Sequence, residues 1–227
     1  MKRASAVLLT SAAAVLMLPA GAQAAPATVG LWHLDEPAGA TVAHDATNPA
    51  NNGQVSGAVT AGVPDYSGHA FHFAGGVVTV PDATALDPGT KPFTVSMWLR
   101  VPSNLSTGDY NVLQKGRATT PGGQYKVEIG GTLQRGVGKP RCTIVDRTGK
   151  AVVVKSRDTD IADGRWHSVL CRRTASSVSI SVDGRTRATT TTGLGSIANA
   201  SPLLFGGKAD GVHSYPGDMD EVALRIG

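Results

Sequence analysis

The sequence predicts an all-β protein, built as a two-sheet antiparallel β-sandwich of the jelly-roll type. Apolar and polar residues alternate in many short segments, and pairs such as Asp-Gly and Thr-Gly mark tight turns between them. Only 17% of the 227 residues are charged, and no convincing amphipathic helix follows residue 24. Because many short strands leave edges that need protection, a doubled or closed sheet is the architecture that fits this pattern.

The first predicted strands are short segments of aliphatic and aromatic residues at positions 29–34, 70–73 and 77–80. The clearest alternation follows in residues 93–101. There every second residue from Phe93 to Val101 is apolar, and Thr, Ser, Trp and Arg lie between them. Successive side chains of a strand point to opposite faces, so this segment has one face suited to a core.

Four further short strands are predicted at residues 111–114, 125–129, 142–145 and 152–155, with a turn at Thr148-Gly149 between the last two. A hairpin region follows, with strands at residues 166–172 and 177–183. Asp183-Gly184 suits a two-residue turn of the primed type, because Gly adopts positive φ without steric cost. The last strands are predicted at residues 203–205 and 221–226.

Residues 1–24 have the pattern of a secretory signal peptide. Lys2 and Arg3 precede an uncharged apolar stretch, which ends in Ala22-Gln23-Ala24. We expect cleavage after Ala24, an extracellular location and a single domain over residues 25–227. An uncleaved membrane anchor is the alternative, but the apolar stretch is short and contains Ser and Thr, and no later segment is long enough to span a membrane.

The chain contains two cysteines, Cys142 and Cys171. In an exported protein two cysteines most simply form one disulfide. Two thiols alone cannot make a four-ligand zinc site, and no pair of histidines has the spacing of a zinc finger. We therefore expect a Cys142–Cys171 disulfide.

Several segments resemble laminin-G-like (concanavalin A-like) jelly-roll domains. Residues 30–39, Gly-Leu-Trp-His-Leu-Asp-Glu-Pro-Ala-Gly, are followed by Asp45 and by Asn51-Asn52-Gly53. The later matching segments, in family order, are residues 93–100, 166–169, 182–184 and 217–222. The resemblance covers essentially all of the chain after residue 24, and it implies a concanavalin A-like sandwich. It does not select a function, because this fold carries lectins, adhesion modules and glycosidases.

The resemblance also implies a structural Ca²⁺ site, since such domains often bind Ca²⁺ through an Asp and Asn-x-Gly loop and an acidic residue of the last strand. The candidate ligands are the side chains of Asp45, Asn48, Asn51 and Asp220 and the carbonyl oxygen of Gly53. Ca²⁺ takes six to eight oxygen ligands of these kinds. The alternative is that Asp45 and the asparagines cap turns through the backbone.

The sequence argues against catalysis. Family members that cleave glucans carry Glu-x-Asp-x-x-Glu on one strand, but the three glutamates here, Glu36, Glu128 and Glu221, do not have this spacing. No Gly-x-Ser-x-Gly elbow is present, and the histidines lack a metal-ligand pattern. An extracellular polysaccharide hydrolase acting through other carboxylates stays open as an alternative.

Two surfaces are candidates for ligand contact. We expect Trp32, Trp98 and Trp166 to lie in the core, because all three fall in family motifs, which leaves the loop residues Tyr66, Tyr110 and Tyr215 as aromatic contacts. Cations are concentrated in residues 111–190, and a basic face is predicted at Arg172, Arg173, Arg185 and Arg187. Such a face would suit an anionic extracellular polymer, or it is simply a solvated surface.

We therefore expect a secreted, monomeric, non-catalytic module that binds a carbohydrate or an anionic cell-surface polymer. A structural or adhesive domain that binds another protein is a further alternative. Nucleic acid is not expected as a partner, because the protein is exported and lacks the aromatic–basic alternation of a nucleic-acid-binding sheet.

Overall fold

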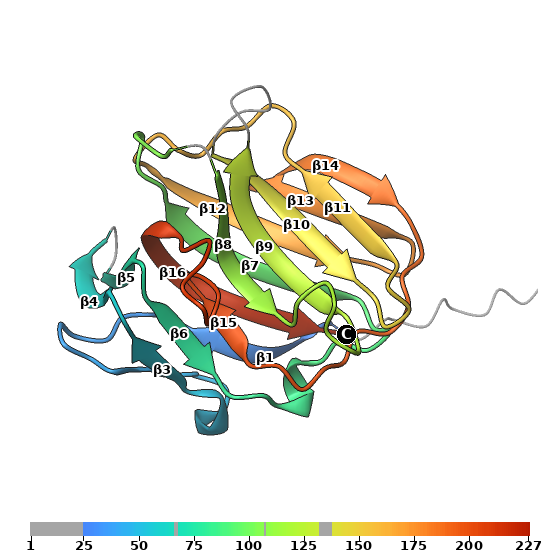
Figure 1. Ribbon diagram of the computed structural model, residues 1–227, viewed down its shortest axis with the longest axis horizontal. Coiled ribbons are helices and arrows are strands. Elements are labelled where there is room, and N and C mark those ends of the chain that lie inside the picture. Colours follow the sequence, from blue (N-terminus) through green and yellow to red (C-terminus); the bar gives the residue numbers. More distant parts are fainter. Residues whose placement is uncertain (1–24, 66–67, 107, 132–137) are drawn as a thin grey trace, which may run out of the picture.

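The computed structural model describes residues 25–65, 68–106, 108–131 and 138–227, so the predicted signal peptide and Tyr66 lie outside the described residues. Sixteen strands form two antiparallel sheets of eight strands each, which stack as a sandwich (Figure 1). Two short 3-10 helices, η1 (Pro49–Asn51) and η2 (Thr84–Leu86), lie in the connections. In this part of the chain no helix is long and apolar enough to cross a membrane.

Sheet A has the strand order β14-β13-β12-β7-β16-β5-β4, with β1 paired to the second half of β16. Its strands are β1 (Ala27–Trp32), β4 (Val59–Pro64), β5 (His69–Ala74), β7 (Phe93–Arg100), β12 (Trp166–Arg173), β13 (Ser177–Val182), β14 (Arg185–Thr191) and β16 (Pro216–Ile226). All pairings in sheet A are antiparallel. The strand order places β7 and β16 in the middle of the sheet.

Sheet B has the order β11-β10-β9-β8-β15-β6-β3-β2. Its strands are β2 (Val42–Ala43), β3 (Gly53–Ser56), β6 (Val77–Val80), β8 (Gly108–Lys115), β9 (Gln124–Gly131), β10 (Lys139–Val145), β11 (Ala151–Lys155) and β15 (Leu203–Phe205). In Figure 1, β7 and β12 of sheet A lie behind β8 to β10 of sheet B.

The core lies between the sheets and follows from the alternation in the sequence. On β7, Phe93, Val95, Met97 and Leu99 are buried, whereas the residues between them face solvent. Trp32 of β1 is fully buried, and its ring meets that of Phe205 edge-on at 5.1 Å. We call the solvent-facing side of sheet A its outer face.

The predicted disulfide is present and joins the two sheets. Cys142 lies on β10 of sheet B and Cys171 on β12 of sheet A, with 5.5 Å between their Cα atoms. Both residues are buried in the core. The bond therefore links two strands that share no backbone pairing.

Most predicted strands are confirmed, and those at residues 77–80 and 203–205 have the predicted bounds. The Asp183-Gly184 turn has φ of 51° and 71°, as the primed type requires. The alternation did not predict β2, β3, β4 or the first half of β16, and β14 was anticipated only through the hairpin turn at Asp183-Gly184. These segments contain Gly, Pro and small or charged residues, and their strand conformation depends on pairing with neighbours rather than on their own propensity.

Candidate functional site

Two tryptophans lie on neighbouring strands of the outer face of sheet A. Trp98 of β7 pairs with Ser168 of β12, and Trp166 of β12 pairs with Arg100 of β7. The two indoles are therefore diagonal neighbours, with backbones about 7–8 Å apart. Trp98 is 44% exposed and Trp166 is partly buried. The expectation that both lie in the core is wrong, because they occupy the outward positions of alternating strands; of the three tryptophans, Trp32 alone is in the core.

Arg100 connects Trp166 to the middle of the sheet. Its guanidinium carbon lies 5.1 Å from the centre of the Trp166 ring, within the range of a cation–π interaction. Arg100 Nε donates to Asp218 Oδ2 at 2.6 Å, and His72 Nδ1 lies 2.7 Å from Asp218 Oδ1. Asp218 of β16 thus has one partner on each neighbouring strand, β7 and β5. These contacts hold a charged, hydrogen-bonding row beside the tryptophans.

The start of β16 has features that bring Asp218 close to β7. Gly217 is required there, because a Cβ at this position would lie 2.6 Å from the carbonyl oxygen of Arg100. The hydroxyl of Tyr215 donates to the carbonyl oxygen of Asp218 at 2.9 Å. The close approach and the buried hydroxyl together fix the backbone on either side of the Asp218 side chain.

The loop tyrosines are not exposed ligand contacts in the way we expected. Tyr215 is fully buried, and burial followed by the charge of Asp218 raises its pKa well above the ordinary value. Tyr110 lies at the start of β8, partly buried, with its hydroxyl 2.6 Å from Ser106 Oγ. The described aromatic residues that face solvent here, Trp98 and Trp166, lie on strands. The alternation of inward and outward residues along those strands could have predicted their exposure.

A pair of carboxyl groups lies beside Trp98. Asp220 of β16 pairs with Trp98 across the strands, and its side chain is hydrogen-bonded to Asp65, next to the end of β4. Burial, and then the hydrogen bond and charge of Asp65, raise the pKa of Asp220 to about 8. Asp220 Oδ1 is buried and has no hydrogen-bond partner in the described part of the chain. Two carboxyl groups in contact are stable together when they share a proton or a cation.

Asp45, the first expected Ca²⁺ ligand, fixes the loop that follows β1. Its Oδ1 accepts hydrogen bonds from Leu31 N, Thr47 N and Thr47 Oγ1 at 2.7–3.0 Å. Its Oδ2 accepts from Asn51 Nδ2 at 3.0 Å. Asn51 is itself buried, and its carbonyl oxygen accepts from Trp32 Nε1 at 3.0 Å. The carboxylate therefore already has four hydrogen-bond donors, which matches the turn-capping alternative.

The other expected ligands, Asn48, Gly53 and Asp220, have their own contacts. Asn48 caps η1, with Oδ1 accepting from Ala50 N at 3.1 Å. Gly53 is buried at the start of β3, where a Cβ would collide with Val78. Asp220 instead contacts Asp65. Within the described ranges, no group of three or more His, Cys, Asp or Glu side chains is placed to hold a metal ion. The expected set contains only two carboxylates, so a Ca²⁺ site formed by these five residues stays a prediction.

The four arginines expected on one basic face lie on different surfaces. Arg172 is exposed on the outer face, but Arg173 points inward, is 2% exposed, and donates to three backbone carbonyls at 3.0–3.2 Å. Arg185 is exposed at the start of β14, and Arg187 Nη1 lies 3.9 Å from Asp158 Oδ2. Arg172 and Arg173 are consecutive residues of one strand, so their side chains point to opposite faces of the sheet.

The solvent side of sheet B carries an ion network that the sequence did not reveal. Glu128 of β9 bonds to Arg141 through Nε and Nη2 at 2.8 and 2.9 Å, and to Lys126 at 2.6 Å. Asp109 lies on the other side of Arg141, at 3.1 Å. Burial alone would raise the pKa of Glu128, but its bonds to Arg141 and Lys126 outweigh this and hold the pKa below its ordinary value.

These contacts do not resemble a glycosidase site. A retaining enzyme needs a general acid with a raised pKa and a second carboxylate about 5–5.5 Å away. Glu128 is held ionised by its cations. Glu36 accepts from His44 N at 2.6 Å, and Glu221 lies 2.7 Å from His33 Nδ1. The raised pKa of Asp220 arises in a pair whose members touch, which is closer than that separation.

Comparison with known proteins places the chain in a family. A family model described as the concanavalin A-like lectin/glucanases superfamily matches residues 73–225. No curated protein sequence matches the chain. Solved structures match most of its length. Their sequence identities are low, 15% and 14% for two of them, so these matches support the fold and not a function.

Three of these structures illustrate the range of similar proteins. Domain 4 of AbnA, an extracellular arabinanase from Geobacillus stearothermophilus solved with arabinotriose, has a TM-score of 0.64 and 14% identity, and the match covers 89% of this chain and 93% of that one. The binding domain of Paraclostridial Mosquitocidal Protein 1 has a TM-score of 0.68 and 15% identity, over 87% and 48% of the two chains. A structure of botulinum neurotoxin type C, whose cell entry is described as dependent upon interaction with two ganglioside molecules, has a TM-score of 0.62 and 14% identity. That match covers 87% of this chain and 47% of the other. This chain therefore spans about half the length of the two toxin structures.

Proposed function

Because the chain belongs to the concanavalin A-like lectin/glucanases superfamily, we propose that it is a secreted, non-catalytic binding module whose carbohydrate ligand lies on the outer face of sheet A. The similar structures include a domain solved with arabinotriose and a toxin that depends on gangliosides, which supports a carbohydrate as the ligand class. Among the described residues, the outer face offers an aromatic platform together with hydrogen-bonding charges.

The observation that carries the proposal is the exposure of Trp98 beside Trp166. A single exposed apolar residue is common on protein surfaces, whereas adjacent aromatic side chains form a contiguous apolar area of the kind that marks binding surfaces. An indole presents an apolar face to the C–H groups of a sugar ring. Arg100, Asp218 and His72 lie in the adjacent row and supply donors and acceptors for hydroxyl groups.

A glycan array tests this proposal with two matched variants. For the glycans that the wild-type protein binds on the array, Trp98→Ala should lower the affinity by about tenfold or more, as expected for a residue that anchors the ligand. Val153→Ala is the control, because Val153 is 56% exposed on β11 of sheet B and its loss should leave binding unchanged. Both variants should keep the melting temperature of the wild type. Equal binding by Trp98→Ala and wild type would reject the site, and retention of no glycan would reject the ligand class.

The secretory part of the proposal rests on residues 1–24 and on the disulfide, since disulfides persist in oxidising compartments. Expression of the full chain with its own N-terminus in a secreting bacterial host should release protein that begins at Ala25. N-terminal sequencing of the released protein checks this. Retention of residues 1–24 on the product would contradict it.

We also propose that Ca²⁺ binds at Asp65 and Asp220 rather than at the Asp45 loop. The support is that two carboxyl groups meet there and that Asp220 Oδ1 lacks a partner among the described residues. Two carboxylates can supply several of the oxygen ligands that Ca²⁺ takes. The melting temperature should be higher in Ca²⁺ than in chelator, and Asp220→Asn should abolish the difference. An unchanged melting curve in wild type would exclude the site.

A further inference from the structure

A second polar region lies on the outer face of sheet A, at the opposite end from Trp166. Arg172 of β12 and Arg225 of β16 both pair with Thr94 of β7, one from each side. Their backbones are two strand spacings apart, about 10 Å. Because all three residues share one face, the two guanidinium groups lie on the same side of the sheet, on either side of Thr94.

Neither arginine is neutralised. The guanidinium of Arg172 has no hydrogen-bond or ion-pair partner among the described residues, and Arg225 Nη1 reaches only Ser96 Oγ, at 3.4 Å. Around them, the outward positions of β12, β13, β7 and β16 are filled by uncharged residues: Leu170, Ser177, Ser179, Ser181, Ser96 and Ala223. At this end of the described face, two arginines without an ion-pair partner are therefore surrounded mainly by serine and threonine hydroxyl groups.

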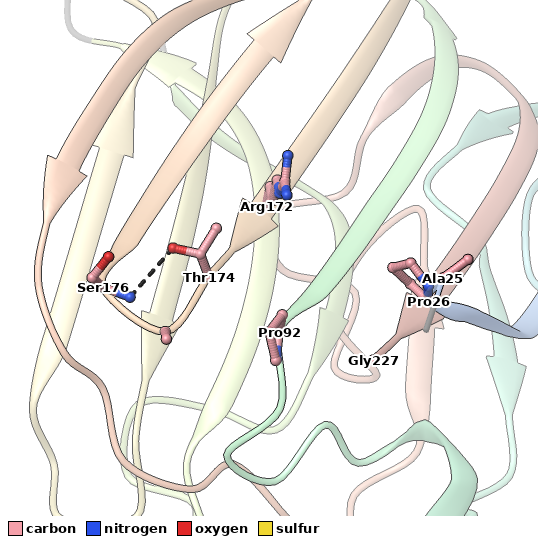
Figure 2. Close-up of a pocket in the computed structure, with 8 residues that line it drawn as sticks. Ala25, Pro26, Pro92, Arg172, Thr174, Ser176 and Gly227 are labelled. Carbon is pink, nitrogen blue, oxygen red and sulfur yellow. Dashed lines mark hydrogen bonds between the residues drawn. The ribbon is translucent and has the colours of Figure 1, made fainter. Parts of the chain in front are cut away.

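A hollow of about 390 Å³ adjoins this end of the face. Figure 2 shows Arg172, Thr174 and Ser176 on one side of it and Ala25, Pro26 and Gly227 on the other, with Pro92 between them. Ser176 N donates to Thr174 Oγ1 at 3.3 Å (Figure 2). The residues Pro26, Pro92, Thr174 and Gly227 continue the outward positions of β1, β7, β12 and β16 past the strand ends, so the hollow extends the outer face.

The arginine pair and the tryptophan pair lie on one continuous surface. Thr94 and Trp98 are four residues apart on β7, which is about 13–14 Å along a strand. Between them is an uncharged row, in which Ser96 pairs with Leu170 on one side and with Ala223 on the other. An oligosaccharide stacked on Trp98 and lying along β7 would reach the arginines within a short length.

We propose that the ligand of this module is an acidic carbohydrate, with a sugar ring on Trp98 and Trp166 and a carboxylate, sulfate or phosphate substituent between Arg172 and Arg225. The inference rests on the proposed function, and it adds the charge class of the ligand. Arginine binds such oxyanions through parallel N–H donors, and the neighbouring hydroxyl groups can donate as well.

An anionic membrane surface is the competing partner for two free arginines. A surface that docks on lipid needs apolar side chains around its cations to enter the interface. Here the outward neighbours of Arg172 and Arg225 on the strands are mainly serines and threonines, and the apolar residues that line the adjoining hollow are alanines and prolines rather than large side chains. The surface chemistry therefore favours a hydroxylated polymer over a lipid headgroup.

The test compares polygalacturonate with its fully methyl-esterified form, which has the same backbone without charge, and includes vesicles of phosphatidylserine and phosphatidylcholine. The proteins are wild type, Arg172→Ala/Arg225→Ala, Trp98→Ala, and the control Arg157→Ala/Arg185→Ala. The control also loses two positive charges at exposed positions. Arg157 follows β11 of sheet B, and Arg185 pairs with Val182, whose side chain faces the core and not the outer face. Binding is measured by calorimetry at low and at physiological salt.

We expect wild type to bind polygalacturonate at least about tenfold more tightly than the ester, with an affinity that falls as salt rises. Arg172→Ala/Arg225→Ala should remove this preference and the salt dependence, while the control variant keeps both. Equal binding of the two polymers, no binding of either, or an equal loss in the control would overturn the proposal. Preferential binding to vesicles would also overturn it. Trp98→Ala should bind both polymers more weakly while keeping the charge preference. Wild-type affinity in Trp98→Ala would reject the tryptophan platform alone, so the two failures are distinguishable.

Discussion

The guanidinium carbon of Arg100 lies 5.1 Å from the ring centre of Trp166, and the same guanidinium donates to Asp218 at 2.6 Å. One side chain therefore joins the aromatic platform to the charged row of the outer face. The platform is positioned by residues of three adjacent strands, β12, β7 and β16. A ligand on this face would meet side chains whose conformations are already fixed, which reduces the entropy lost on binding.

Replacing Arg100 by Lys should distinguish the effect of its positive charge on glycan binding from the effect of its planar guanidinium group. A lysine ammonium keeps the positive charge beside Asp218, but it lacks the planar group that lies over the Trp166 ring while also donating through Nε. We expect Arg100→Lys to weaken glycan binding by about fivefold, equivalent to about 1 kcal/mol, with little change in melting temperature. Calorimetry and thermal unfolding measure the two effects. Wild-type affinity in this variant would show that Arg100 does not position the platform.

Asp45 should contribute to stability without any metal. Its buried carboxylate accepts four hydrogen bonds, and removing it leaves those donors unpaired. We expect Asp45→Ala to lower the free energy of unfolding by about 2 kcal/mol. Urea unfolding in Ca²⁺ and in chelator should give the same loss. A loss that disappears in chelator would instead assign Asp45 to the metal, as the sequence alone suggested.

His167 should make stability depend on pH. Burial opposes its charged form, but hydrogen bonds to Asp183 and Asp163 and their charges outweigh burial and raise the pKa of His167. A raised folded-state pKa adds stability that is complete below the unfolded-state pKa and is lost as pH rises through the folded-state value. The stability difference between wild type and His167→Gln should therefore be larger at pH 5.5 than at pH 8.5. A difference that does not change with pH would contradict this interpretation.

The architecture was predictable because its causes are local and repeated. Alternation predicts a strand wherever one face is buried, and β7 shows this from Phe93 to Leu99. The disulfide followed from the number of cysteines and the expected compartment. The same alternation places Trp98 outward and puts Arg172 and Arg173 on opposite faces. The positions of Trp98 and Arg173 could therefore have been predicted from the alternation alone.

The composition of the site was less predictable, because it depends on which distant strands are neighbours. Asp220 meets Asp65 only because β16 lies beside β5, which in turn pairs with β4. Arg172 and Arg225 are 53 positions apart, and only their shared partner Thr94 brings them together. Pairing between strands far apart in the chain has no local signal in one sequence.

The central claim, that the ligand lies on Trp98, is tested most directly by NMR of the tryptophan side chains. The chain has three tryptophans, so its spectrum should contain three indole N–H signals, which Trp98→Phe and Trp166→Phe assign. Titration with the tightest-binding glycan of the array should shift the Trp98 and Trp166 signals and leave that of the buried Trp32 in place. Saturation by the glycan with an unmoved Trp98 signal would contradict the account and place the ligand elsewhere on the molecule.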